Sequence, residues 1–439
     1  RSLILAMVVN VVLIAIPFFL LLIAIELFLN FYKKKKAYRL NDTLTDISCG
    51  IIERITGLFT KLFSIGIFAY VSENFALQHF LPLPAVSYGP LWEWGKTGFI
   101  FYPSNTLSWI IVFLAVDFFY YWAHRFSHEI NLLWAGHVVH HSSEEFNLAV
   151  ALRQSSLHGL FVWVFPLPLA IFGVPWQMLF VCYGINLVYQ FWIHTQFINK
   201  FPKWVEYIFN TPSHHRVHHG RNPKYIDKNY AGVFIIWDRM FGTFQAEEET
   251  PTYGLTTPVN SWNPVWVNIH FFIDIFYALK KAKNFREVWE ALWGKPDNLA
   301  GIERHPKKEI MDPPYNPAVP FSINLWATFQ FVLTLGAAYA LVQLPNLAYV
   351  YKVLGAFFII FSLVNVGGML ELKKWVPMAQ VILSLSFLLF LLHLWQAQIW
   401  QITLVLPFVI LVSLTIILAV FILRSYFSIK TVNQKVEYF

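Results

Sequence analysis

Repeated apolar runs of about 20 residues constrain this chain more than any other feature. The first run, Leu3–Phe31, is apolar except for Asn10, Glu26 and Asn30. A run of that length can cross the hydrocarbon core of a bilayer as a helix. Of the 439 residues, 57% are hydrophobic and only 13% are charged, about half the charged share of a soluble domain. The sequence therefore predicts an all-α, polytopic integral membrane protein.

We expect about nine transmembrane helices. The basic run Lys33–Lys36 directly follows the first of them and places that end in the cytoplasm. The net charge of +7 thus bears on membrane orientation and anionic lipid, not on nucleic acid. The runs on either side of Gly173 form a pair that returns the chain to the side it left. The expected spans are Leu3–Phe31, Leu62–Phe80, Phe99–Trp122, His158–Phe172, Val174–Trp192, Ile323–Leu344, Leu347–Leu370, Val376–Trp395 and Ile402–Leu423.

The polar stretch near residue 300 divides the chain into three expected parts. Residues 1–277 form a membrane-embedded domain, residues 278–320 a cytoplasmic connection, and residues 321–439 a C-terminal membrane region of four helices. The two cysteines, Cys49 and Cys182, provide neither a disulfide framework nor a CxxC metal site. Because the first residue is Arg1, we expect the numbering to begin inside a longer protein. The first apolar run is too long for the core of a signal peptide.

Histidines gather in two short windows. Nine of the 15 histidines lie in His124–His141 and His214–His219. Imidazole is the commonest metal ligand that proteins offer near neutral pH. The expected topology brings both windows to the cytoplasmic face, so the sequence predicts a metal site there.

The spacing of these histidines indicates shared helix faces, because residues three and four apart lie on one side of a helix. His124 and His128 are four apart, and the pattern HxxHH occurs twice. Eight to ten imidazoles exceed the about four to six ligands of one metal ion, so we expect two ions. Imidazole binds zinc, copper, iron and nickel alike; zinc would indicate hydrolysis and iron would indicate oxygen activation. The candidate ligands are His124, His128, His137, His140, His141, His194, His214, His215, His218 and His219.

Isolated histidines have a simpler interpretation. Structural hydrogen bonding suits His79, His270, His305 and His393. His158 lies near the motifs without a spaced companion and fits either role. A proton relay would string imidazoles across the membrane, whereas the clustered ones gather at one depth.

The ordered motifs HxxxH, HxxHH and HxxHH in a membrane protein resemble the fatty acid hydroxylase and sterol desaturase superfamily of diiron oxygenases. Within it, the chain between Asp117 and Phe244 resembles the alkylglycerol monooxygenases, in the blocks WAGHVVHHSSEEFNLAVALRQS, YQFWIHTQFIN, NTPSHHRVHHGRNPKYIDKNYAGVFIIWD and MFGTF. The segments KKKKAYRLNDTLTDISCG and YGLTTPVN extend the likeness. The last four apolar runs resemble that family only in hydropathy and position.

The resemblance implies a reaction and its cofactors. Such enzymes use O₂ and tetrahydrobiopterin to hydroxylate the ether-linked carbon of an alkylglycerol lipid, which then yields a fatty aldehyde and a glycerol derivative. Two iron ions would be held by the histidines of the three motifs, with His194 and His214 as additional ligands.

Residues beside the motifs gain roles from the same resemblance. Glu129 directly follows the first motif and would orient an imidazole, although a salt bridge with Arg125 or Arg153 explains it equally well. The residues after the third motif would surround the pterin, and an ordinary turn around Asn222 and Pro223 is the alternative. These pterin candidates are Arg221, Tyr225, Asp227, Asn229 and Tyr230.

Two other functions stay open. The first is a hydroxylase or desaturase of the same superfamily that acts on fatty acyl chains, sterols or carotenoids. The second is a membrane metal transporter, which would need a polar path through the spans. For the enzyme we expect a multi-pass protein of the endoplasmic reticulum in a eukaryote, or of the inner membrane in a bacterium.

Overall fold

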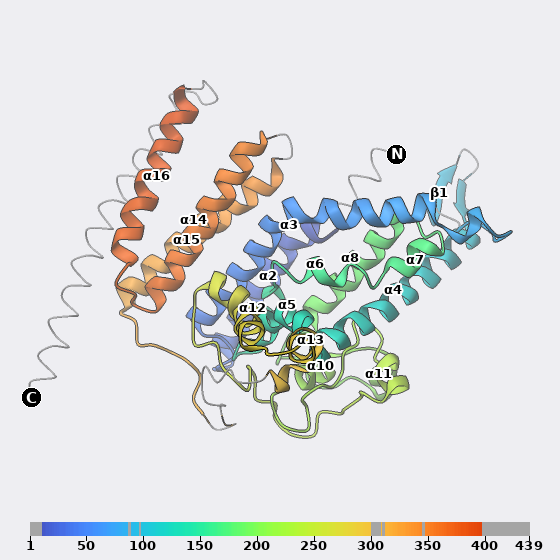
Figure 1. Cartoon of the computed structure of the whole chain (residues 1–439), viewed down its shortest axis with the longest axis horizontal. Coiled ribbons are helices and arrows are strands. Elements are labelled where there is room, and N and C mark those ends of the chain that lie inside the picture. Colours follow the sequence, from blue (N-terminus) through green and yellow to red (C-terminus); the bar gives the residue numbers. More distant parts are fainter. Residues whose placement is uncertain are drawn as a thin grey trace, which may run out of the picture. The chain divides into compact units, whose positions relative to one another are not determined.

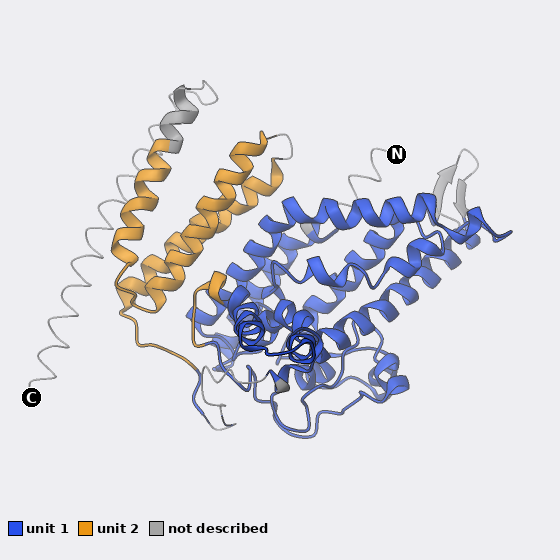
Figure 2. Cartoon of the chain, in the orientation of Figure 1, with its two compact units in different colours: residues 1–259, 267–314 blue, residues 260–266, 315–439 orange. Residues whose placement is uncertain are grey.

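The computed structural model describes residues 11–86, 89–95, 98–299, 309, 312–344 and 347–396. The chain separates into two compact units, with residues 1–259 and 267–314 in unit 1 and residues 260–266 and 315–439 in unit 2 (Figure 2). The expected boundaries at residues 277 and 320 stay a prediction.

Unit 1 is almost entirely helical (Figure 1). Its helices are α2 (Val11–Tyr32), α3 (Leu40–Asn74), η1 (Leu77–His79), α4 (Pro103–Glu129), α5 (Asn131–His141), η2 (Val150–Leu152), α6 (Gly159–Val162), α7 (Leu167–Ile171), α8 (Trp176–Trp192), α9 (Lys203–Ile208), α10 (Pro212–His218), α11 (Ile236–Phe241), α12 (Pro264–Lys281), which begins in unit 2, α13 (Phe285–Trp293) and η3 (Pro296–Asn298). One antiparallel hairpin, β1 (Trp92–Gly95) with β2 (Gly98–Phe101), interrupts them. Strand β2 covers the start of the expected span Phe99–Trp122, whose helix α4 begins at Pro103.

Five described helices are long and apolar enough to cross a membrane: α2, α3, α4, α14 (Phe321–Gln343) and α15 (Tyr349–Leu370). Most of the expected run Leu62–Phe80 lies in the longer α3, which ends at Asn74 and is followed by η1. The first half of α3 also carries polar residues. That half stays helical because Asp42, Asp46 and Ser48 are buried against the rest of the unit.

The expected span His158–Phe172 is wrong as a single long helix. Two short helices, α6 and α7, take its place. Pro166 and Pro168 each lack an N–H group and clash with the preceding turn, which prevents one continuous helix. Its partner α8 is formed over 17 residues.

Apolar packing joins the helices that carry the histidine motifs. Phe68 of α3, Val112 and Val116 of α4, and Met178 and Cys182 of α8 share one buried cluster. In a second cluster, the rings of Phe19 in α2 and Phe191 in α8 stack with centroids 4.0 Å apart. These contacts hold α4, which carries the first motif, and α8, which leads to His194, in a fixed relation.

Unit 2 contains α14, α15 and α16 (Val376–Gln396), where the sequence predicted three C-terminal spans. The fourth expected span, Ile402–Leu423, lies outside the described residues. Hydrogen bonds link the apolar helices: Thr334 Oγ1 lies 2.7 Å from Ser362 Oγ, and Asn365 Nδ2 donates to Gln380 Oε1 at 2.5 Å. Such bonds contribute to the association of helices in lipid.

A buried carboxylate on α4 fixes the segment that follows the third motif. Asp117 accepts hydrogen bonds from the Val233 and Phe234 amides, at 2.7 and 3.1 Å, and from Trp237 Nε1 at 2.9 Å. It also accepts from Asn186 Nδ2 of α8 at 2.6 Å. A Cβ on Gly232 would lie 2.8 Å from the Asp117 carboxylate, so only glycine permits this approach.

We expect Asp117→Ala to lower the free energy of unfolding by about 3–5 kcal/mol, because several buried donors would lose their acceptor. Thermal unfolding of the detergent-purified protein measures this loss. The control is Glu73→Ala, which removes an exposed carboxylate from α3 and should leave Tm unchanged. Equal Tm values for the two variants would contradict the anchoring role.

Candidate metal centre

Nine buried histidines form two groups in unit 1. Within each group, one ring nitrogen per residue lies within 4.8 Å of the others. The five-histidine group contains His124, His128, His137, His141 and His218, and the four-histidine group contains His140, His194, His215 and His219.

The distances within the groups suit metal ligation. The Nε2 atoms of His124 and His137 are 2.9 Å apart, and those of His137 and His141 are 3.1 Å apart. In the other group, His194 Nε2 lies 2.9 Å from His215 Nε2 and 3.3 Å from His140 Nε2. Two nitrogens at right angles around one metal, each ~2.1 Å from it, lie ~3.0 Å apart.

Each HxxHH motif contributes to both groups. On α5, His137 and His141 are four apart and share a direction, while His140 points to the second group. On α10 the arrangement is reversed, because His215 and His219 join the four-histidine group and His218 joins the other. The rings of His141 and His219 stack with centroids 4.4 Å apart, so the two groups adjoin.

Backbone carbonyls select the tautomer of four rings. The Nδ1 atoms of His124, His140, His194 and His218 lie 2.7, 3.2, 2.8 and 2.9 Å from the carbonyl oxygens of Tyr230, Arg153, Gln190 and Lys228. A carbonyl oxygen accepts only, so each Nδ1 carries the proton and each Nε2 keeps its lone pair for a metal.

The remaining ring nitrogens also fit a metal. Nε2 of His128, His218 and His219 is buried and has no hydrogen-bond partner among the described residues, which is costly unless another species binds there. Burial, and then neighbouring imidazoles, hold the pKa of His137, His141, His215 and His219 well below the ordinary value. Burial lowers the pKa of His194 to about 4. These rings are neutral at pH 7, which is the form that binds metal.

A buried network of ion pairs stabilises the segment that contacts the four-histidine group. Arg153, whose carbonyl faces His140, donates from Nη1 to Asp46 at 2.9 Å and lies 3.4 Å from Asp42. Its Nε donates to the carbonyl of Val139 at 3.0 Å and to Ser142 Oγ at 2.9 Å. The arginine therefore caps the C-terminal end of α5, where cations are favourable.

Two more carboxylates hold the segment after His194. Buried Glu26 of α2 accepts hydrogen bonds from Thr195 Oγ1, from the Tyr38 hydroxyl and, at 2.8 Å, from the Leu148 amide. Arg216, paired with Glu247 at 2.7 Å, donates to the Thr195 carbonyl at 3.1 Å.

Some candidates from the sequence lie outside both groups. His214 Nε2 is 2.9 Å from a Glu206 oxygen. His158 Nε2 is 3.0 Å from Ser127 Oγ. Glu129 forms an ion pair with Arg125 at 2.9 Å, the alternative that the sequence left open. His270 Nδ1 lies 2.9 Å from the Val267 carbonyl, as expected of a structural histidine.

The five pterin candidates divide by their contacts. The Tyr225 hydroxyl accepts from the Glu248 and Glu249 amides, at 2.8 and 2.7 Å. Asn229 bonds the backbone of His214 and Gln245, and Arg221 Nη2 donates to the Glu309 carbonyl at 2.8 Å. Tyr225, Asn229 and Arg221 therefore stabilise the segment that follows the third motif. By contrast, the buried Tyr230 hydroxyl has no hydrogen-bond partner within the described part of the chain, and an Asp227 oxygen lies 3.7 Å from His128 Nδ1.

Several supporting residues had only a weak signal in the sequence. Glu26 stands alone in an apolar run, which is an intramembrane carboxylate and hence unusual. Asp42, Asp46 and Arg153 are about 110 residues apart and have no spacing pattern that would link them. Their pairing depends on how α3 and η2 meet.

Known proteins share this arrangement of motifs. The family model for fatty acid hydroxylase matches residues 109–243, which include all nine histidines. The alkylglycerol monooxygenase of Homo sapiens is 39% identical over 387 residues, covering 86% of this chain and 81% of that protein. The chain belongs to the alkylglycerol monooxygenase family.

Further members agree with this assignment. The alkylglycerol monooxygenase of Danio rerio is 35% identical over 96% of this chain and 90% of its own length, and that of Xenopus tropicalis is 38% identical over 73% and 68%. No solved structure matches the chain. Membership of this family makes the protein a monooxygenase and favours the enzyme over the metal transporter.

We expect His219→Ala to reduce bound metal by about half, because one of the two groups loses a ligand. His214→Ala is the matched control: it removes a neighbouring imidazole that lies outside both groups and should leave metal content unchanged. Elemental analysis of the purified variants, with Tm as the measure of folding, checks both. Equal metal loss in the two variants would contradict the grouping.

Proposed function

We propose that this enzyme hydroxylates the ether-linked carbon of alkylglycerol lipids, with two iron ions in its histidine groups and tetrahydrobiopterin as reductant. The observation that carries the proposal is the pair of adjoining, all-imidazole groups in a member of this family. A monooxygenase that activates O₂ at a metal needs one that changes oxidation state, and zinc does not.

The reaction balances with one O₂ and one pterin. One oxygen atom is inserted into the C–H bond beside the ether oxygen, and the other leaves as water. The pterin supplies two electrons and two protons. The resulting hemiacetal breaks its C–O bond to give a fatty aldehyde and a glycerol derivative. The iron ions, when bound, supply the activation of O₂ that an unreactive C–H bond requires.

The chain's own residues exclude water and fix the ligands. All nine imidazoles are buried, which protects a reactive oxidant from discharge by solvent. Four carbonyl groups hold the ligating nitrogens toward the metals. This rigidity suits a site where binding geometry decides reactivity.

We assign Tyr230 and Asp227 to the surroundings of the pterin or the reacting atoms, because both keep polar atoms beside the five-histidine group. The centroid of the Tyr230 ring is 5.2 Å from that of His128. Burial, followed by the Asp227 and Glu129 carboxylates, raises the pKa of the Tyr230 hydroxyl. The phenol therefore stays protonated and can donate a hydrogen bond.

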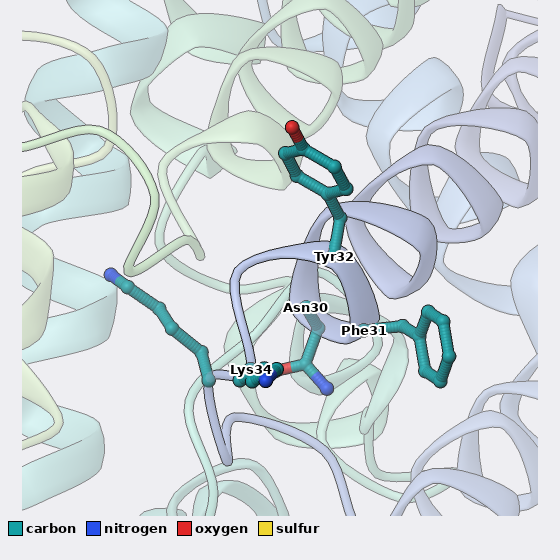
Figure 3. Close-up of a pocket in the computed structure, with 5 residues that line it drawn as sticks. Asn30, Phe31, Tyr32 and Lys34 are labelled. Carbon is teal, nitrogen blue, oxygen red and sulfur yellow. The ribbon is translucent and has the colours of Figure 1, made fainter.

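A cytoplasmic orientation of the site is part of the proposal. The basic run after α2 supports it, because Lys35 Nζ donates to the Gln196 carbonyl at 3.2 Å, two residues from His194. Figure 3 shows this end of α2, where Asn30, Phe31, Tyr32, Lys34 and Lys35 line an open pocket of about 450 Å³. Positive residues favour the cytoplasmic side. We propose the endoplasmic reticulum in a eukaryote and the inner membrane in a bacterium.

Metal content, read for iron, zinc and copper together, is the first test. We expect about two irons per chain, and cleavage of an alkylglycerol in lipid nanodiscs that requires tetrahydrobiopterin. His140→Ala should abolish cleavage while the protein stays folded. A folded protein without metal would refute the metal centre, and cleavage that needs no pterin would refute the reductant alone.

We expect Tyr230→Phe to lower the rate of cleavage by about 10-fold, the effect of one lost hydrogen bond, with Tm and metal content unchanged. The reason is that this hydroxyl has no hydrogen-bond partner among the residues that the structure describes. The matched variant Tyr225→Phe removes an acceptor from two amides and should lower Tm instead. Unchanged cleavage by Tyr230→Phe would remove this residue from the site.

A further inference from the structure

Helix α13 (Phe285–Trp293) has three distinct faces. At 100° per residue, Val288, Ala291 and Leu292 lie toward the unit, and Ala291 is buried. Arg286, Glu287 and Glu290 form a charged face. Between these faces, the residues Phe285, Trp289 and Trp293 form one aromatic stripe.

The aromatic stripe is exposed within the described residues. Phe285 is 79% exposed, Trp289 55% and Trp293 45%. Their rings follow one another along the helix, with centroids 6.5 and 5.8 Å apart. Large side chains in one contiguous row are typical of a surface that binds something apolar.

The hydrogen bonds between α13 and the start of α5 indicate where the aromatic stripe lies relative to the membrane. The Asn131 amide donates to the Gly294 carbonyl at 2.9 Å, and Asn131 Nδ2 donates to the Glu290 carbonyl at 3.1 Å. Asn131 comes two residues after Glu129, where the candidate membrane span α4 ends. Over its 27 residues, α4 is ~40 Å long at ~1.5 Å per residue, about the thickness of a bilayer with its headgroups. The C-terminal end of α13 is therefore joined to the point where a span leaves the membrane.

Basic residues flank the stripe. Lys280 and Lys281 end α12, Lys283 follows, and Arg286 lies in the first turn of α13. Such residues complement anionic headgroups, and tryptophan is enriched where headgroups meet acyl chains. An aromatic stripe with a charged face beside it is typical of a helix that lies in the plane of the interface.

We propose that α13 is an interfacial helix whose aromatic stripe binds membrane lipid at the level where α4 ends. Its hydrogen bonds to Asn131 then hold the start of α5, and with it the second histidine motif, at a fixed height relative to the lipid surface. The expected connection over residues 278–320 stays a prediction, and the proposal places one of its segments at the lipid surface. It does not depend on the substrate or the reductant.

Site-directed fluorescence of the full chain in nanodiscs of phosphatidylcholine and phosphatidylglycerol tests the proposal. Trp289→Cys and Glu290→Cys are compared, because both side chains are 55% exposed and adjacent. Each variant carries a small fluorophore on its new cysteine; the natural cysteines are buried, and the unsubstituted protein reports any label on them. One quencher is a nitroxide high on the lipid acyl chain, and the other is aqueous iodide.

We expect the lipid nitroxide to quench the label at residue 289 roughly threefold more than the label at residue 290, since interfacial helices insert only ~5–10 Å. Iodide should show the opposite preference. A label at 289 that iodide reaches as readily as at 290, or one shielded from both quenchers by protein, would overturn the proposal. Trp293→Cys provides a second position on the stripe should Trp289→Cys fail to fold.

Discussion

The hydrogen bonds from histidine Nδ1 atoms to backbone carbonyls are the interaction on which the site depends. A carbonyl inside a regular helix already accepts a bond, so three of the four acceptors, in Arg153, Lys228 and Tyr230, lie in irregular segments. Those segments are in turn held by buried polar groups. Asp238, for example, accepts from the Tyr230 and Ala231 amides at 2.8 and 2.9 Å. The loops around the histidines are therefore fixed parts of the metal centre, not simple connections.

The charged residues behind the centre carry a large desolvation cost. Arg153 is 1% exposed, and Asp42 and Asp46 are equally buried, so removing one partner would leave an uncompensated charge in an apolar surrounding. This desolvation cost is offset because one residue, Arg153, makes several stabilising contacts. Arg153 pairs with α3, caps α5 and, through its carbonyl, sets the tautomer of His140. Because Arg153 contacts both helices, the position of α5 is sensitive to any change in α3.

Sequence reasoning found the histidines and the membrane character because both depend on local spacing. Sequence reasoning did not find how the histidines divide between the two groups. The spacing of HxxHH shows which imidazoles share one face of a helix, but not which histidines of another helix they meet. His194 has no spaced companion, and only its resemblance block and its place at a span end marked it. The two prolines, Pro166 and Pro168, indicate a helix break from the sequence alone. By contrast, the sequence does not show that α3 stays helical past Asp42 and Asp46, because that depends on their pairing with Arg153. The aromatic stripe of α13 has a clear i, i+4, i+8 pattern, but the many charges around it suggested a connecting loop.

The division of the HxxHH motifs also orders the biosynthesis of the centre. The five-histidine group needs His218 and the four-histidine group needs His219, so the centre as a whole stays incomplete until the chain is made through residue 219. Before that stage α2, α3 and α4 have already been synthesised, and the first two motifs present five imidazoles without their distant partners. Contacts this far apart in sequence form slowly. Complete ligand sets for two metals therefore require synthesis of the chain past α2, α3, α4, α5 and α8.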